Sequence, residues 1–165
     1  MNRSIRFALI TALLGVASVA ACEHGATEPS LPDGVVALRA SLAPYSSLAL
    51  ARGAGYNTAI TDCMSNGDEG AMGIHYANTA LIDARPDSLH PEALIYEPGS
   101  NGEASLVGVE FIVPFAAVSR QSPPPVLFGQ AYSPNDVFGV WALHVWTHRS
   151  NPSGTFATWN PRVHC

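Results

Sequence analysis

Val140-Trp-Ala-Leu-His-Val-Trp-Thr-His148 predicts a β-strand, in which successive side chains point alternately to two different faces. One face carries the large apolar side chains Trp141, Leu143 and Val145. The other carries Ala142, His144, Trp146 and His148. We predict that the first face packs into the core and that the second contributes to a functional site.

Two earlier stretches repeat this layout, Ala71-Met-Gly-Ile-His-Tyr76 and Leu106-Val-Gly-Val-Glu-Phe-Ile-Val113. His75 and Glu110 lie on their less apolar faces. The large apolar residues of the second stretch occupy the odd positions Val107, Val109, Phe111 and Val113. Each polar candidate also follows a very small residue two positions earlier, namely Gly73, Gly108 or Ala142, which would leave space for a bound group. We predict that the three strands bring His75, Glu110 and His144 together.

Two histidines and one carboxylate on a rigid sheet form the ligand set of open mononuclear metal sites. The expected cofactor is one divalent transition metal, zinc, iron or copper, with Tyr96 and Trp146 lining a pocket beside it. No HExxH motif or tight HxH spacing is present. Two alternatives therefore stay open. His75 and His144 are buried core histidines with Glu110 paired to an arginine such as Arg149, or the three groups form a metal-free acid/base pocket.

The first 21 residues have the pattern of a secretory signal peptide. A short basic segment, Met1–Arg6, precedes an apolar run from Phe7 to Ala21 that is too short to span a bilayer. The run ends in Val19-Ala-Ala-Cys22, which is typical of a bacterial lipoprotein processing site with Cys22 as the acylated residue. We predict an exported protein held to a membrane by lipid, facing the periplasm or the cell exterior. A plain signal peptide cleaved nearby is the alternative.

The remaining cysteines and the charge agree with export. Cys63 and Cys165 are the only other cysteines, and an oxidising compartment favours a disulfide between them over two free thiols. After residue 21 the chain contains six arginines and thirteen acidic residues. This acidity argues against nucleic acid as a partner. Because the chain has no lysine, Schiff-base chemistry and a P-loop are excluded.

We expect a polar tether over residues 22–33 and a single globular domain over residues 34–165. Apolar residues recur at helical spacing from Val35 to Arg52, with Asp33 as the N-cap and a kink or break at Pro44. An antiparallel hairpin should join Ala93–Glu97 to Ala104–Val113. The fold class is therefore α+β, an N-terminal helix packed on a mainly antiparallel sheet, followed by an irregular C-terminal tail.

Several segments resemble a group of exported bacterial proteins, some of them lipoproteins, of uncharacterised function. They are Gly70-Ala-Met-Gly-Ile-His-Tyr76, Pro91-Glu-Ala-Leu-Ile-Tyr-Glu-Pro98, Leu106-Val-Gly-Val-Glu-Phe111, Leu143-His-Val-Trp146, Asn151-Pro-Ser-Gly-Thr-Phe156 and Trp159-Asn-Pro161. The resemblance covers most of the chain from about Ala51 onward. It implies the domain limits but no activity, substrate or cofactor.

Two functional hypotheses follow from these patterns. One is a lipid-anchored metal-binding protein, with enzymatic activity undecided, that uses His75, Glu110 and His144. The other is a metal-free binding or interaction module of the cell envelope whose polar residues are structural. The metal content of protein purified without a histidine tag distinguishes them.

Overall fold

The computed structural model describes residues 30–165, so the predicted signal peptide and the lipidation site at Cys22 lie outside the described residues. The N-terminal helical segment is split, as Pro44 predicted. Helix α1 (Asp33–Ser41) is followed by the 3-10 turn η1 (Ala43–Ser46), which contains that proline, and then by α2 (Leu48–Gly53). Asp33 is not the N-cap but the first helical residue; the carbonyl of Pro32 accepts the first backbone hydrogen bonds instead.

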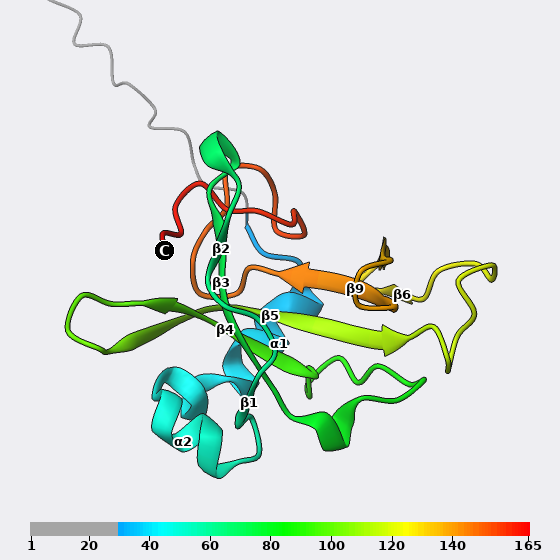
Figure 1. Ribbon diagram of the computed structural model, residues 1–165, viewed down its shortest axis with the longest axis horizontal. Coiled ribbons are helices and arrows are strands. Elements are labelled where there is room, and N and C mark those ends of the chain that lie inside the picture. Colours follow the sequence, from blue (N-terminus) through cyan, green and yellow to red (C-terminus); the bar gives the residue numbers. More distant parts are fainter. Residues whose placement is uncertain (1–29) are drawn as a thin grey trace, which may run out of the picture.

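The strands that follow in the described chain form a seven-stranded antiparallel sheet and a separate two-stranded one (Figure 1). The strands of the larger sheet are β1 (Thr58–Ala59), β2 (Met64–Ser65), β3 (Ala71–Ala77), β4 (Ala93–Pro98), β5 (Ala104–Pro114), β8 (Ser133–Asn135) and β9 (Val140–Val145). Their order is β1-β3-β4-β5-β9-β8, with β2 also paired to β3. A separate hairpin is formed by β6 (Val126–Leu127) and β7 (Gln130–Ala131), and short 3-10 turns lie at η2 (Gly67–Glu69) and η3 (Thr79–Leu81). The predicted α+β class and the β4–β5 hairpin are confirmed.

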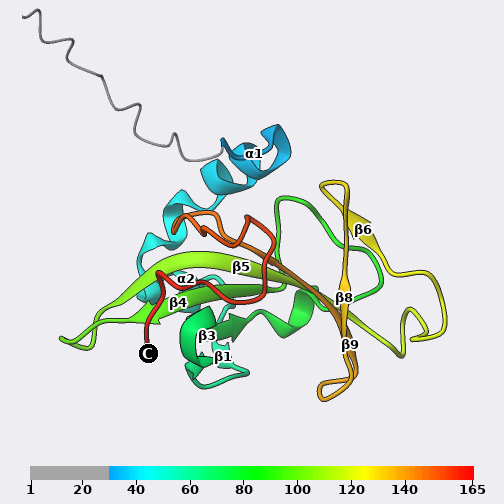
Figure 2. The same ribbon diagram turned by 90° about the horizontal axis from the view of Figure 1, so that it is seen from above.

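Successive side chains along the strands alternate between a helix-covered face and a second face. Core residues of the first face include Tyr76 on β3, Phe111 on β5 and Leu143 on β9, which cluster with Val35 and Leu38 of α1. In Figure 2, α1 lies above β5, whereas β1 and β3 lie below it. The sheet therefore packs its apolar face on the helices and leaves its other face for the polar residues.

A bulge changes this alternation at one point. On the β4 side, Tyr96 pairs with Leu106 and Ile95 pairs with Gly108, which leaves Val107 as an extra residue. The prediction that Val107 shares the face of Val109 is therefore wrong. The extra residue in the bulge makes Leu106, rather than Val107, point to the same face as Val109. Leu106 joins the main core, and Val107 joins a smaller cluster that also contains Trp146.

The chain leaves the sheet earlier than the sequence pattern predicted. Strand β9 ends at Val145, and the next backbone N–H, that of Trp146, donates to the carbonyl of Thr155 in the tail. The tail is irregular and ends in the predicted Cys63–Cys165 disulfide, which joins residues 102 positions apart. The disulfide indicates an oxidising compartment outside the cytoplasm. Within residues 30–165, no helix is long and apolar enough to cross a membrane.

A buried carboxyl group marks the start of β4. Ala93 is the first residue of β4 and pairs with Glu110, so Ile112, two residues farther along β5, has no partner on β4. The backbone N–H of Ile112 instead donates to the Glu92 carboxyl group at 3.0 Å. Only 1% of Glu92 is exposed. Desolvation raises the pKa of this carboxyl group to about 7, although the hydrogen bond from Ile112 opposes the shift.

Glu92 should make the stability of the fold depend on pH. Because its pKa is higher in the folded protein than in the unfolded chain, the folded protein retains a proton that the unfolded chain has released. Stability should therefore fall as the pH rises from about 4.5 to about 7, by up to about 3 kcal/mol for this group. Chemical unfolding across this range, with a chelator present, should show a flatter profile for Glu92→Gln than for the wild type. Parallel profiles would contradict the prediction.

Candidate metal centre

The structure brings His75, Glu110 and His144 together on the face opposite the helices. Glu110 on β5 and His144 on β9 are direct partners across neighbouring strands. His75 lies on β3, which is separated from β9 by β4 and β5. Three strand spacings in a flat sheet would place β3 about 14 Å from β9. The imidazoles nevertheless meet, because the two side chains extend toward each other across the strands that lie between them.

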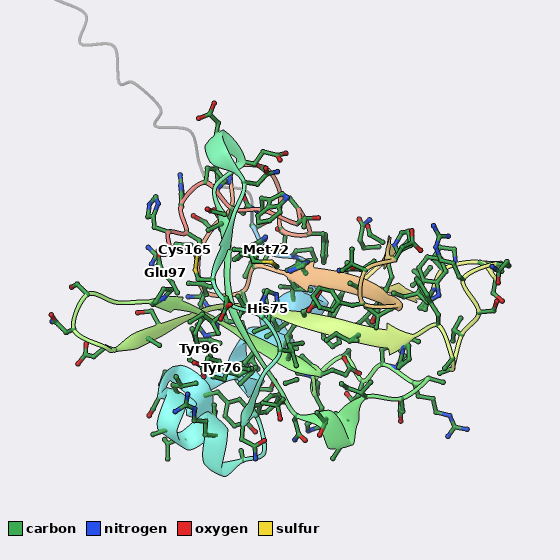
Figure 3. All side chains as sticks on the ribbon, in the orientation of Figure 1. Met72, His75, Tyr76, Tyr96, Glu97 and Cys165 are labelled. Atoms are coloured by element: carbon green, nitrogen blue, oxygen red, sulfur yellow. A yellow bond between two sulfur atoms is a disulfide. The ribbon has the colours of Figure 1, made fainter. Side chains whose placement is uncertain are left out.

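Small residues lie in register with Glu110 on both β4 and β3. Ala93 lies in register with both Ala77 of β3 and Glu110 of β5, and it is fully buried. Figure 3 shows the labelled Tyr76 and Tyr96 near α2, whereas the labelled His75 lies farther from that helix. Tyr76 belongs to the core that contains Val35 and Leu38 of α1, and His75 does not. Consecutive residues of β3 therefore point to opposite faces, as the sequence pattern predicted.

The three side chains are close enough to share one ion. Nε2 of His75 lies 3.1 Å from Nε2 of His144, and each of these nitrogens lies 3.7 Å from an oxygen of Glu110. One donor atom from each residue lies within 4.8 Å of the other two. A tetrahedral ion with bonds of about 2.0 to 2.2 Å holds its ligand atoms about 3.3 to 3.6 Å apart. The two 3.7 Å distances reach different oxygens of Glu110, so the side chains would have to move by up to about 1 Å to enclose an ion in that geometry.

Burial controls the protonation of the triad. His75 is 1% exposed, and Glu110 and His144 are each 8% exposed. Desolvation lowers the pKa of His75 to about 4 and that of His144 to about 3, and it raises the pKa of Glu110 to about 8. Near neutral pH the imidazoles are therefore neutral, which is the form that binds metal, and metal binding would release a proton from Glu110.

The ion pair between Glu110 and Arg149, proposed as one alternative, is not formed. Arg149 instead contacts the carboxylate of Glu97, and its backbone N–H donates to Val107. Glu110 faces the two histidines.

Thr61 is a site residue that sequence reasoning missed. Its hydroxyl lies 2.9 Å from Nδ1 of His75 and also accepts the backbone N–H of His75 at 3.2 Å. When Nδ1–H donates to this hydroxyl, the Nε2 lone pair is free for a metal ion. Thr61 lies in an irregular segment between β1 and β2, where no periodic pattern could have indicated its role.

The glycines beside the triad have a different role from the predicted one. Gly73 has φ +84°, and a Cβ atom there would lie 2.7 Å from the carbonyl oxygen of Tyr96. At Gly108 a Cβ atom would lie 2.8 Å from the carbonyl oxygen of Val145. Both glycines allow close approach of neighbouring backbones rather than space for a ligand.

The triad lies in the wall of a cleft with a volume of about 640 Å³. Ala142 and Thr61 line this cleft, together with residues of β8 and of the turn between β8 and β9. The structure does not place Tyr96 on it. Tyr96 belongs to the main core, and its hydroxyl donates to the carbonyl of Tyr45. Trp146 is also buried outside the cleft lining, although its ring stacks on His144 with centroids 6.3 Å apart.

No protein-family model matches this chain, and neither a curated protein nor a solved structure shows a significant match to it. The chemistry of the triad and of its cleft is therefore the basis for a functional proposal.

Replacing Thr61 by valine should weaken metal binding by about 10- to 100-fold, because the orienting partner of His75 is lost while the shape of the side chain is kept. Competition with a chromophoric chelator measures the affinity. Thr58→Val is the matched control, since the Thr58 hydroxyl contacts Asn57 rather than the triad. Equal affinities for the wild type and Thr61→Val would show that Thr61 does not orient the ligand.

Proposed function

We propose that this protein is an exported, lipid-anchored metal-binding protein that holds one divalent transition metal through His75, Glu110 and His144. The observation that carries the proposal is the convergence of three buried donor groups from three strands within 4.8 Å. Two imidazoles and one carboxylate suit zinc, iron and copper. Because the ligands come from paired strands, the site is held rigidly.

Three protein ligands leave a coordination position for water or for another molecule. All three residues also line the 640 Å³ cleft, so that position can be reached by a small ligand. This arrangement supports exchange at the metal rather than a closed structural site. It is the arrangement that metal-assisted catalysis requires, although the proposal itself is limited to binding.

The proposed location joins two observations. The disulfide indicates an oxidising compartment, and the segment ending at Cys22 predicts acylation there. A lipid on Cys22 would tether the domain to a membrane facing the periplasm or the cell exterior.

A metal-free interaction module is the second candidate. The observation in its favour is the distance of 3.1 Å between the imidazoles, which suits a hydrogen bond from one neutral ring to the other. The triad would then be a buried polar network that joins β3, β5 and β9. The two candidates differ in metal retention.

The wild type, purified without a histidine tag and loaded with Zn²⁺, should retain about one equivalent of metal after desalting. His144→Ala should retain none, because one of the three ligands is removed. Val109→Ile, a conservative change in the main core, should retain the wild-type amount. Elemental analysis provides the measurement.

Glu110→Gln serves as a second test that does not disturb packing. Glutamine has the shape of the protonated carboxyl group but cannot supply an anionic oxygen, so this variant should fold and lose most of its affinity. A wild type that retains no metal after loading with zinc, iron or copper would establish the metal-free alternative.

Processing at Cys22 is tested separately. The wild type should partition with membranes and have an acylated N-terminus at Cys22, whereas Cys22→Ala should accumulate as unprocessed or soluble protein. Fractionation with mass spectrometry of the N-terminus measures both. A soluble wild type beginning at another residue would show that the lipoprotein assignment is wrong.

A further inference from the structure

The cleft beside the triad has the size and lining of a site for a small organic molecule. Its volume of about 640 Å³ lies within the range of about 300 to 1,000 Å³ typical of ligand pockets. Much of its wall is apolar, with contributions from Ile60, Met72, Ile112, Val137, Phe138 and Val140. A ligand of this cleft should therefore have an apolar body.

The cleft offers such a ligand one point that could attract a negative charge, the proposed metal. Among the described residues that line it, the titratable side chains are the triad and Asp136. The carboxylate of Asp136 is negatively charged and pairs with Arg120, whose Nε lies 2.9 Å away. No arginine belongs to the lining, so a negatively charged group on the ligand would have to interact with the bound metal.

The net charge of the metal with its three protein ligands determines the sign and size of the charge that the organic ligand should carry. A divalent ion with two neutral imidazoles and one carboxylate has a net charge of +1. Because the three protein ligands are almost completely buried, this charge is poorly solvated and favours one anionic donor in the open position. A single negative group balances the centre, whereas a dianion would leave an uncompensated charge in an apolar cleft.

The rim of the cleft is also apolar. Val137 and Phe138, in the turn between β8 and β9, are 89% and 55% exposed, and Ile60 is 36% exposed. All three line the cleft. Exposed apolar side chains at the mouth of a concave site are expected where an apolar ligand enters and remains partly outside.

We propose that the cleft binds a monocarboxylate with an apolar body, whose carboxylate completes the coordination of the metal. The inference rests on the proposed metal site. It adds the class of ligand and the direction in which the ligand lies, with its anionic end at His75, Glu110 and His144 and its apolar body between Ile112 and Phe138.

Octanoate is a suitable probe, with acetate as the matched acid that lacks the apolar body. Protein loaded with Co²⁺ is titrated with each acid, and the change in the visible spectrum of the metal reports coordination. Octanoate should bind at least about 30-fold more tightly than acetate, because its additional methylene groups leave water. Octanol, which has the body without the carboxylate, should not shift the spectrum.

Two exposed positions supply matched variants outside the metal site. Phe138→Ser should weaken octanoate binding several-fold while leaving acetate binding and the cobalt content unchanged. Leu50→Ser, at a similarly exposed position on α2 that does not line the cleft, should leave all three unchanged.

The outcomes separate the two proposals. Failure to retain cobalt overturns the metal site and this inference with it, before any acid is added. Retained cobalt with equal affinity for octanoate and acetate overturns the apolar site alone. Octanoate that binds equally well to the metal-free protein, or an affinity ratio that Phe138→Ser leaves unchanged, also overturns it.

Discussion

Strand β5 buries both of its faces, and the rest of the domain depends on this constraint. Its residues Val109 and Phe111 pack against the helix-covered core, while Glu110 between them faces the histidines. Pairing with β4 on one edge and β9 on the other satisfies its backbone. Any shift of register by one residue would exchange the two faces and place a carboxyl group among the core side chains.

This arrangement has an electrostatic consequence for the polar face. Buried ionisable groups take the protonation state that carries no charge, unless a partner compensates the charge. The lowered pKa values of His75 and His144 and the raised pKa of Glu110 therefore describe an uncharged triad. A divalent ion would reverse this preference for Glu110 alone, since the histidines bind as neutral rings. The binding of a metal ion is thus coupled to the release of a single proton, that of Glu110.

The sequence predicted the parts of this structure that follow from period-two alternation. Strand facing was enough to place His75, Glu110 and His144 on one side, and cysteine counting was enough to pair Cys63 with Cys165.

Features that depend on tertiary contacts could not be predicted from the sequence. The bulge at Val107 is set by pairing with β4, and the role of Thr61 depends on a loop that folds back on β3. Glu92 could not be singled out in the same way, because a carboxyl group before a strand normally indicates a solvated turn. The need for its acceptor arises only where β4 begins, beside Ile112.

The disulfide also sets a condition for the site. Cys63 lies two residues after Thr61, the hydrogen-bond partner of His75, and its bridge to Cys165 spans 102 positions. Thiols stay reduced in the cytoplasm, so this edge of the cleft is held by a covalent bond only in an oxidising compartment. The redox state around the protein therefore bears on the segment that orients the ring of His75.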